Sequence, residues 1–166
     1  IIAGNSFGYF ESIEDDKRVL KEVMRVLKPE GKLLIDVTDG KYMLENYQPR
    51  SWEWIDKNYF VCRERSLSED RERLVSREVI THVHKGVVAD QFYAERLYSQ
   101  EDLKRLLTDA GFEKFNSYSN LTAESKRNQD LGMMAERIIV TALADKQWSP
   151  VPRAVRERDS VLVLMG

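Results

Sequence analysis

Apolar residues recur along the chain with two spacings, one typical of helices and one of strands. Over residues 15–28 and 99–110 they return every three or four positions, as on one face of an amphipathic helix. Short apolar runs predict strands at residues 1–4, 32–37, 112–118 and 136–143. The order strand, helix, strand at the start predicts a parallel pair, and the last two strands could pair as a hairpin that ends the sheet.

Both expected helices have clear signals at their ends. Ser12 and Ser99 each stand three residues before an aspartate, an arrangement that resembles a capping box. The first helix should end at residues 28–31, Lys-Pro-Glu-Gly, because proline cannot continue the helical hydrogen bonds and glycine accepts the turn. Gly111 should end the second helix.

The middle of the chain, residues 52–98, has little helical periodicity and many β-branched and aromatic residues. We expect three antiparallel strands there, at residues 53–66, 73–84 and 87–98. The turns between them are predicted at residues 68–70 and 85–86. These strands would form an antiparallel insertion, at about residues 50–98, between the earlier parallel strands and the later hairpin.

The end of the chain has a different composition. Residues 145–159 are polar and charged and contain two prolines, which is typical of a linker. Residues 160–166 are apolar and end in glycine, as an opening strand and its turn would. They either begin a further domain or form a terminal strand that packs back on the domain of residues 1–144.

Composition and charge argue against several classes of function. With 166 residues, 42% of them apolar, the chain can form one sizeable core. The net charge of −2 comes from 26 basic and 28 acidic residues that are interspersed, so we expect no nucleic-acid partner. Cys62 is the only cysteine, which excludes an internal disulfide and a cysteine-rich zinc site and suits a cytoplasmic protein. No apolar run is long enough to span a membrane, and no signal peptide is recognisable.

Three segments resemble a known enzyme family. Residues 5–10, Asn-Ser-Phe-Gly-Tyr-Phe, and residues 25–36, which contain Leu-Lys-Pro-Glu-Gly-Lys, are similar to the region from strand four to strand five of class I S-adenosylmethionine-dependent methyltransferases. Residues 110–112, Ala-Gly-Phe, resemble a later part of the same fold. The resemblance covers about residues 1–144. It implies an α/β fold: the C-terminal half of a Rossmann-like sheet, with the antiparallel insertion as a lid.

The resemblance implies where the cofactor would lie. Enzymes of this family transfer a methyl group by in-line displacement from S-adenosyl-L-methionine, so their main task is to position the acceptor. The cofactor-binding residues implied are Asn5, Ser6, Phe7 and Gly8, and Tyr9 is implied as a catalytic residue. Glycine permits close backbone approach, and an aromatic face favours a cation. Alternatively, the aromatic residues of this segment belong to the core.

Residues for a small-molecule acceptor are expected in the lid and after strand five. Arg96 and Tyr98 could orient an anionic or hydroxylated acceptor, although Arg96 could instead pair with a carboxylate on an exposed sheet face. Tyr42 and Trp54 could line the acceptor pocket, or they could be core or interface anchors. Asp39, in the loop after strand five, is the candidate catalytic base.

Two histidines could suggest a metal site or a general base. His82 and His84 are two residues apart and therefore share one strand face. No third ligand accompanies them in a local motif, so we assign no metal ligands and interpret this face as an ordinary polar one.

The part of the family pattern that holds most of the cofactor is missing. Neither the glycine-rich turn after a first strand nor the acidic residue that binds the ribose is recognisable. The chain begins with Ile1, which hints at a start inside a longer reading frame, although processing or trimming would leave the same start. We expect the chain alone to bind cofactor weakly or not at all and to be inactive. We also expect a homo-oligomer, or an upstream segment, to cover an open sheet edge.

Two other functions are compatible with these patterns. The chain could be a non-catalytic binding or assembly module on a methyltransferase scaffold, or part of another Rossmann-type enzyme such as a reductase. A dinucleotide-binding fingerprint upstream would favour the reductase. Binding of S-adenosylmethionine by the longer protein would favour the methyltransferase.

Overall fold

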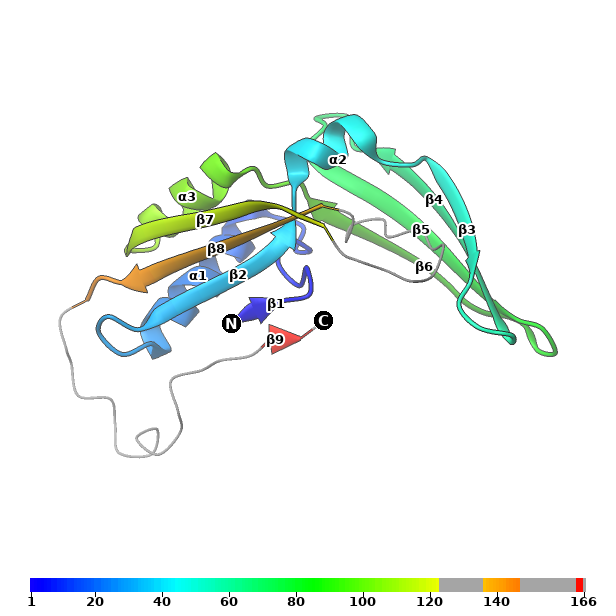
Figure 1. Ribbon diagram of the computed structural model, residues 1–166, viewed down its shortest axis with the longest axis horizontal. Helices are drawn as coiled ribbons and strands as arrows, with labels where there is room; N and C mark the ends of the chain where they lie inside the picture. Colours follow the sequence, from blue (N-terminus) through cyan, green and yellow to red (C-terminus); the bar gives the residue numbers. More distant parts are fainter. Residues whose placement is uncertain (123–135, 147–163, 166) are drawn as a thin grey trace.

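The computed structural model describes residues 1–122, 136–146 and 164–165. These residues form two β-sheets and three helices, and the second sheet extends away from the first (Figure 1). In chain order the elements are β1 (Ile2–Ala3), α1 (Ile13–Val26), β2 (Lys32–Thr38), α2 (Gly40–Asn46), β3 (Arg50–Trp54), β4 (Tyr59–Leu67), β5 (Arg73–His82), β6 (Gly86–Arg96), α3 (Gln100–Asp109), β7 (Phe112–Thr122), β8 (Glu136–Ala144) and β9 (Leu164–Met165).

The first sheet has the strand order β7-β8-β2-β1-β9. Strand β1 is parallel to β2, with Ile2 opposite Ile35, and α1 connects the two strands. Strand β8 is antiparallel to both β2 and β7, and β9 is parallel to β1. The predicted parallel pair, the terminal hairpin and the α/β fold class are therefore confirmed.

One face of the first sheet carries the main hydrophobic core. Leu33, Ile35 and Val37 alternate along β2 and are all buried, as the two-residue period of a strand requires. Helices α1 and α3 lie behind this sheet in Figure 1. The neighbouring strand β8 and these two helices contribute further buried residues to the core: Ile138, Val140, Ala142, Leu20, Val23, Leu27, Leu103, Leu106 and Leu107.

The helix ends follow the sequence signals closely. The Ser12 side chain accepts a hydrogen bond from the Asp15 backbone N–H and thereby caps α1. Ser99 and Asp102 form a complete capping box at the start of α3. Gly111 follows α3 with a φ of +92°, in the left-handed region that favours glycine. Helix α1 spans residues 13–26 rather than the expected 15–28.

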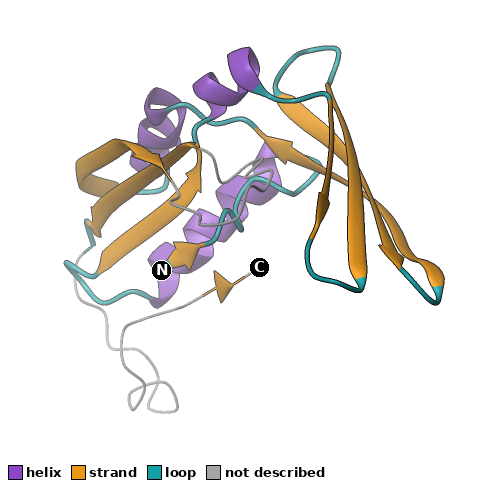
Figure 2. Cartoon of the chain, turned by 45° about the vertical axis from the view of Figure 1, so that its right-hand side comes forward, coloured by secondary structure: helices purple, strands orange, loops and turns teal. Residues whose placement is uncertain are grey.

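The second sheet contains four antiparallel strands, in the order β3-β4-β5-β6, instead of the expected three. The segment expected as one strand, 53–66, is divided by a turn at residues 55–58. In this turn the Asp56 carboxylate accepts hydrogen bonds from the backbone N–H groups of Asn58 and Tyr59. The flanking aromatic residues favour strands, so composition alone hides the turn. Figure 2 shows the two sheets as separate layers joined by loops.

Helix α2 has no counterpart among the predicted elements. It has only seven residues, too few for a recognisable helical repeat, and it begins at a glycine. Asp39 caps it by accepting hydrogen bonds from the backbone N–H groups of Lys41 and Tyr42. Met43 of α2 packs with Leu74 and Leu97 in a small second core. Because Leu74 belongs to β5, this core joins α2 to the second sheet.

Some predicted segments lie outside the described residues. Strand β7 continues to Thr122, beyond the expected end at residue 118, and residues 123–135 are not described. Of the expected linker, 145–159, only the first two residues are described, and of the apolar segment 160–166 only Leu164 and Met165. The division of the chain into domains stays a prediction. No helix in the described part of the chain is both long and apolar enough to cross a bilayer.

Candidate functional site

The carboxyl ends of β1 and β2 lie where the two sheets meet. In open α/β sheets, ligands bind outside the carboxyl ends of the parallel strands. The segment that follows β1, residues 4–11, is called here the β1 loop. It contacts the end of β6, because the Arg96 backbone N–H donates to the Gly8 carbonyl at 2.8 Å. The Gly40 N–H, after β2, donates to the Tyr98 carbonyl at 3.0 Å. The second sheet is therefore attached at the edge where a ligand is expected.

Asn5 is the central residue of this junction. It is buried and adopts a left-handed backbone conformation, with a φ of +58°. Its side-chain oxygen accepts from the Thr38 backbone N–H at 2.8 Å. Its side-chain nitrogen donates to the Glu95 carboxylate at 2.5 Å and to the Tyr9 hydroxyl at 3.1 Å. One side chain thus links the β1 loop to β2 and to β6.

Glu95 is a buried acid at the end of β6, only 1% exposed. Its Oε2 accepts hydrogen bonds from Asn5 and from the Tyr9 hydroxyl, the latter at 3.3 Å. Its Oε1 is also buried and has no hydrogen-bond partner. Burial raises the pKa of Glu95 to about 7, although the hydrogen bonds from Asn5 and Tyr9 oppose this rise. Burial and the nearby Glu95 also raise the pKa of Tyr9.

Glu95 was not among the residues predicted for the site. The predicted residues Arg96 and Tyr98 share one face of the β6 segment, whereas Glu95 lies on the other, opposite Leu74 of β5. A signal was available, because Glu95 alternates with Tyr93 and Leu97 on a face that is otherwise apolar at this end. An acid at such a position is unusual enough to suggest a function.

Arg96 and Tyr98 are engaged in a buried network with α1. The Tyr98 hydroxyl donates to Asp16 at 2.7 Å, and the Arg96 guanidinium lies 3.4 Å from the same carboxylate. Arg96 also pairs with Glu72 at 3.1 Å. Burial raises the pKa of Asp16, while the hydrogen bond from Tyr98 opposes this. Arg96 therefore pairs with carboxylates, one of them fully buried, and a role for either residue toward an acceptor stays a prediction.

The other residues predicted for the cofactor lie together in the β1 loop. Phe7 is buried and stacks on Tyr98, with ring centroids 5.6 Å apart. The Ser6 hydroxyl donates to the Ala3 carbonyl at 2.8 Å. Gly8 has a φ of +97°, and a Cβ there would lie 3.3 Å from the Arg96 carbonyl oxygen. Phe7 thus has the core position considered as its alternative, while Tyr9 is 40% exposed at the loop surface.

The residues predicted for the acceptor do not all come together. Asp39 and Tyr42 lie beside each other after β2, where Asp39 caps α2 and Tyr42 is partly exposed. Trp54 is 53% exposed and stacks with Phe60 at a centroid distance of 5.2 Å. It precedes the β3–β4 turn, at the end of the second sheet that points away from the first (Figure 1). The structure therefore does not place Trp54 with the β1 loop.

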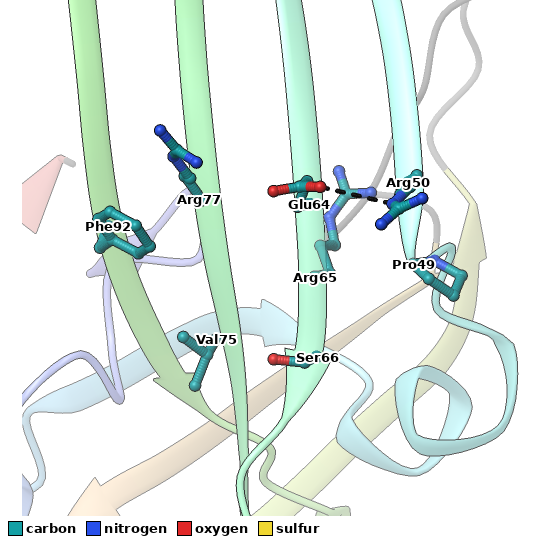
Figure 3. A pocket seen from close by; sticks show the side chains of 8 residues that line it. All are labelled: Pro49, Arg50, Glu64, Arg65, Ser66, Val75, Arg77 and Phe92. Carbon is teal, nitrogen blue, oxygen red and sulfur yellow. Dashed lines mark ion pairs between the residues drawn. The ribbon is translucent and has the colours of Figure 1, made fainter.

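A groove lies on the face of the second sheet that is opposite to Glu95. Figure 3 shows its lining, which comprises Pro49, Arg50, Glu64, Arg65, Ser66, Val75, Arg77 and Phe92. Arg50 pairs with Glu64 at 3.4 Å, and Arg77 pairs with Asp90 at 2.7 Å. Cross-strand register places Glu64, Arg77 and Phe92 on the same face, away from Glu95. Because Arg50 and Arg77 of this groove are each paired with a carboxylate, we do not assign the groove to the site.

His82 and His84 lie at the β5–β6 turn, with ring centroids 5.9 Å apart. The His84 backbone N–H donates to His82 Nδ1 at 3.1 Å. Within the described ranges, no group of three or more His, Cys, Asp or Glu side chains could hold a metal ion.

The chain is similar in sequence to one curated protein described as a putative methyltransferase. No family model matches the chain. Among curated proteins, the chain is 27% identical over 116 residues to "Putative methyltransferase YqeM" of Bacillus subtilis (strain 168), covering 68% of the chain and 47% of that protein. The chain thus spans about half the length of the curated relative that it matches.

Three solved structures with a similar fold are methyltransferases. An S-adenosylmethionine-dependent methyltransferase from Clostridium acetobutylicum ATCC 824 superposes with a TM-score of 0.60 at 18% identity, covering 85% of this chain and 55% of that one. The CcbJ methyltransferase from Streptomyces caelestis gives 0.62 at 12% identity, with 86% and 55% covered. The sugar N-methyltransferase KedS8 from Streptoalloteichus sp ATCC 53650 gives 0.55 at 16% identity, with 86% and 54% covered. At these identities the structures show the fold.

Proposed function

We propose that this chain, which has the fold of the C-terminal part of class I S-adenosylmethionine-dependent methyltransferases, supplies the acceptor side of such an enzyme. The complete protein would transfer a methyl group from S-adenosylmethionine to a small-molecule acceptor. Sequence similarity to the Bacillus subtilis relative and fold similarity to three solved methyltransferases support this proposal.

The observation that carries the proposal is the position of the β1 loop. Asn5 holds this loop at the carboxyl ends of β1 and β2, through its hydrogen bonds to Thr38 and Glu95. This edge is where open α/β sheets bind ligands. The loop is also one of the segments whose sequence resembles the family, so sequence and geometry indicate the same place.

The β1 loop fits the methionine part of the cofactor. Gly4 is exposed, and no atom lies within 4 Å of a Cβ built on it, which leaves room for close approach of a ligand. Tyr9 and Phe10 are 40% and 52% exposed, so their faces could attract the sulfonium cation. S-adenosylmethionine would supply the methyl group, and Asn5, Ser6, Phe7 and Gly8 would hold its methionine end.

The described residues of this chain supply only part of such a site. The adenosine end of the cofactor would need a glycine-rich turn and a ribose-binding acid, which we expect from a further segment of the complete protein or from a partner copy. Within the described residues, β9 pairs with both residues of β1, Ile2 and Ala3. A longer strand at this edge would complete the sheet beside the β1 loop.

Calorimetric titration of the complete protein with S-adenosylmethionine tests the proposal. We expect saturable binding, and weaker or no binding for the 166-residue chain alone. Asn5→Ala should weaken binding by about tenfold because it releases the β1 loop, which corresponds to about 1.4 kcal/mol. Glu64→Gln, on the opposite face of the second sheet, is the matched control and should bind as the wild type does. If the complete protein does not bind the compound, a non-catalytic module on this scaffold becomes the better interpretation.

A further inference from the structure

The unpartnered oxygen of Glu95 is a buried polar atom that the fold alone does not explain. Native proteins pair nearly all buried polar side-chain atoms, so an unpaired carboxylate oxygen calls for a specific reason. Glu95 is 1% exposed, and its Oε1 has no partner, whereas its Oε2 has two. The carboxylate is thus held by two donors at Oε2, while the buried Oε1 lacks a donor.

Among the described residues, no charged group donates a hydrogen bond to Glu95. The two donors to Oε2 are the amide of Asn5 and the hydroxyl of Tyr9, both from the β1 loop and both uncharged. Arg65 of β4 and Arg137 of β8 are the positive charges that act on Glu95. Arg137 pairs with Asp36, and Arg65 donates to the Gln48 carbonyl and to the Ser51 hydroxyl. A cationic donor at Oε1 would provide both the missing hydrogen bond and the missing charge.

We propose that Glu95 selects an amine as the methyl acceptor, with Oε1 accepting a hydrogen bond from the amino group that is to be methylated. This inference rests on the proposed function, and it names the class of acceptor and the residue that recognises it. A primary or secondary amine is protonated in water at neutral pH and would bind as the cation that the site lacks. An alcohol could donate a hydrogen bond but would leave the charge of Glu95 unbalanced.

The proposed reaction consists of a proton transfer to Glu95 and a displacement at the methyl carbon. The ammonium group first transfers one N–H proton to Glu95, which frees the nitrogen lone pair. The nitrogen then forms a bond to the methyl carbon while the bond from that carbon to sulfur breaks, and the electron pair remains on sulfur. S-adenosylhomocysteine is released, and the methylated ammonium product leaves with its charge. Glu95 returns its proton to solvent, so it is unchanged overall.

The burial of Glu95 supports this role. With a pKa of about 7, the carboxyl can take up and release a proton at neutral pH, as a general base must. The hydrogen bonds from Asn5 and Tyr9 fix its orientation, and Asn5 in turn is fixed by Thr38. Because these donors come from the β1 loop, the proposed amine would lie next to the methionine end of the cofactor.

The first experiment compares acceptors with the complete wild-type protein and S-adenosylmethionine labelled in its methyl group. The probes are benzylamine, cyclohexylamine and glucosamine, each tested against the compound that has a hydroxyl in place of the amino group, and N-methylbenzylamine as a secondary amine. We expect label in amines and none in the alcohols. Label in the alcohols, or no labelled amine from a protein that binds S-adenosylmethionine, would overturn the inference. Failure to bind S-adenosylmethionine would instead contradict the proposed function.

The second experiment removes the charge and keeps the shape. Glu95→Gln retains a side-chain oxygen for Asn5, so the β1 loop should stay in place, and thermal unfolding would confirm that the variant folds. We expect kcat/KM for the best amine to fall by about 100-fold or more, with cofactor affinity unchanged. The wild type should lose activity below about pH 7 and the variant should lack this pH limb. Glu64→Gln is the matched control. If Glu95 has only a structural role, the pH profile of Glu95→Gln will be like that of the wild type, and this result would contradict the inference.

Discussion

The side chain of Asn5 donates a 2.5 Å hydrogen bond to the carboxylate of Glu95, which lies 90 residues further along the chain. Asn5 follows the short strand β1 of the first sheet, and Glu95 is the last residue but one of β6 in the second. Because both residues are buried, this contact fixes the β1 loop relative to the second sheet. The segment proposed to hold the cofactor and the strand proposed to meet the acceptor are thus parts of one polar junction.

Removing the Asn5 side chain should loosen this junction. Asn5→Ala deletes the hydrogen bonds to Thr38 and Glu95 and leaves a residue with a Cβ at a positive φ. We expect a loss of about 2–3 kcal/mol in the free energy of unfolding. Asn5→Gly loses the same hydrogen bonds but tolerates the backbone conformation, so it should be about 1 kcal/mol more stable than Asn5→Ala. Urea denaturation measures both, and equal stability of the two variants would show that the backbone conformation is not strained.

The buried acid should make stability depend on pH. The pKa of Glu95 is raised from 4.5 to about 7 in the folded protein, so its contribution to stability is fully present below about pH 4.5 and is lost as the pH rises through about 7. Glu95→Gln lacks this titration. As the pH rises from about 4.5 to above 7, the wild type should therefore lose about 3 kcal/mol of unfolding free energy relative to the variant. A difference that stays constant with pH would mean that Glu95 keeps its ordinary pKa.

The hydrogen bond between Tyr98 and Asp16 should contribute measurably to stability. Tyr98→Phe keeps the stacking on Phe7 but removes the 2.7 Å hydrogen bond to a fully buried carboxylate. We expect a loss of about 1–3 kcal/mol, because Asp16 is left with one donor fewer. Tyr118→Phe is the control, since Tyr118 is 56% exposed and should change stability by less than about 0.5 kcal/mol. Chemical denaturation of both variants makes the comparison.

Gly40 should be hard to replace. A Cβ at this position would lie 2.4 Å from the backbone carbon of Leu97 and 2.7 Å from the nitrogen and oxygen of Tyr98. Backbone atoms cannot move aside as a flexible side chain can, so Gly40→Ala should lose about 3 kcal/mol or more. Gly4→Ala provides the comparison, because a Cβ at Gly4 would meet no other atom. This variant should lose only about 1–2 kcal/mol in the free energy of unfolding, which is the cost of a Cβ at a positive φ. Thermal unfolding that ranks Gly4→Ala as the less stable variant would contradict the close packing at Gly40.

The elements that the sequence predicted correctly are those whose signal is local. The heptad-like spacing of Leu20, Val23 and Leu27 and the serine caps depend only on near neighbours, so α1 and α3 could be predicted with little error. The turn at Asp56 and the seven-residue helix α2 were missed, because aromatic composition hides the first and shortness hides the second. The segment of Asn5 to Tyr9 was singled out by its resemblance, but its hydrogen-bond partners were not.

By itself the sequence determined helices α1 and α3, the parallel start, the terminal hairpin and the methyltransferase-like class, since periodicity and short motifs carry these. Only the tertiary structure decided that Glu95 belongs to the candidate site, that Arg96 and Tyr98 bind Asp16, and that Trp54 lies apart. The reason is distance along the chain. These contacts join residues up to 90 positions apart, and register between strands decides which face each side chain occupies.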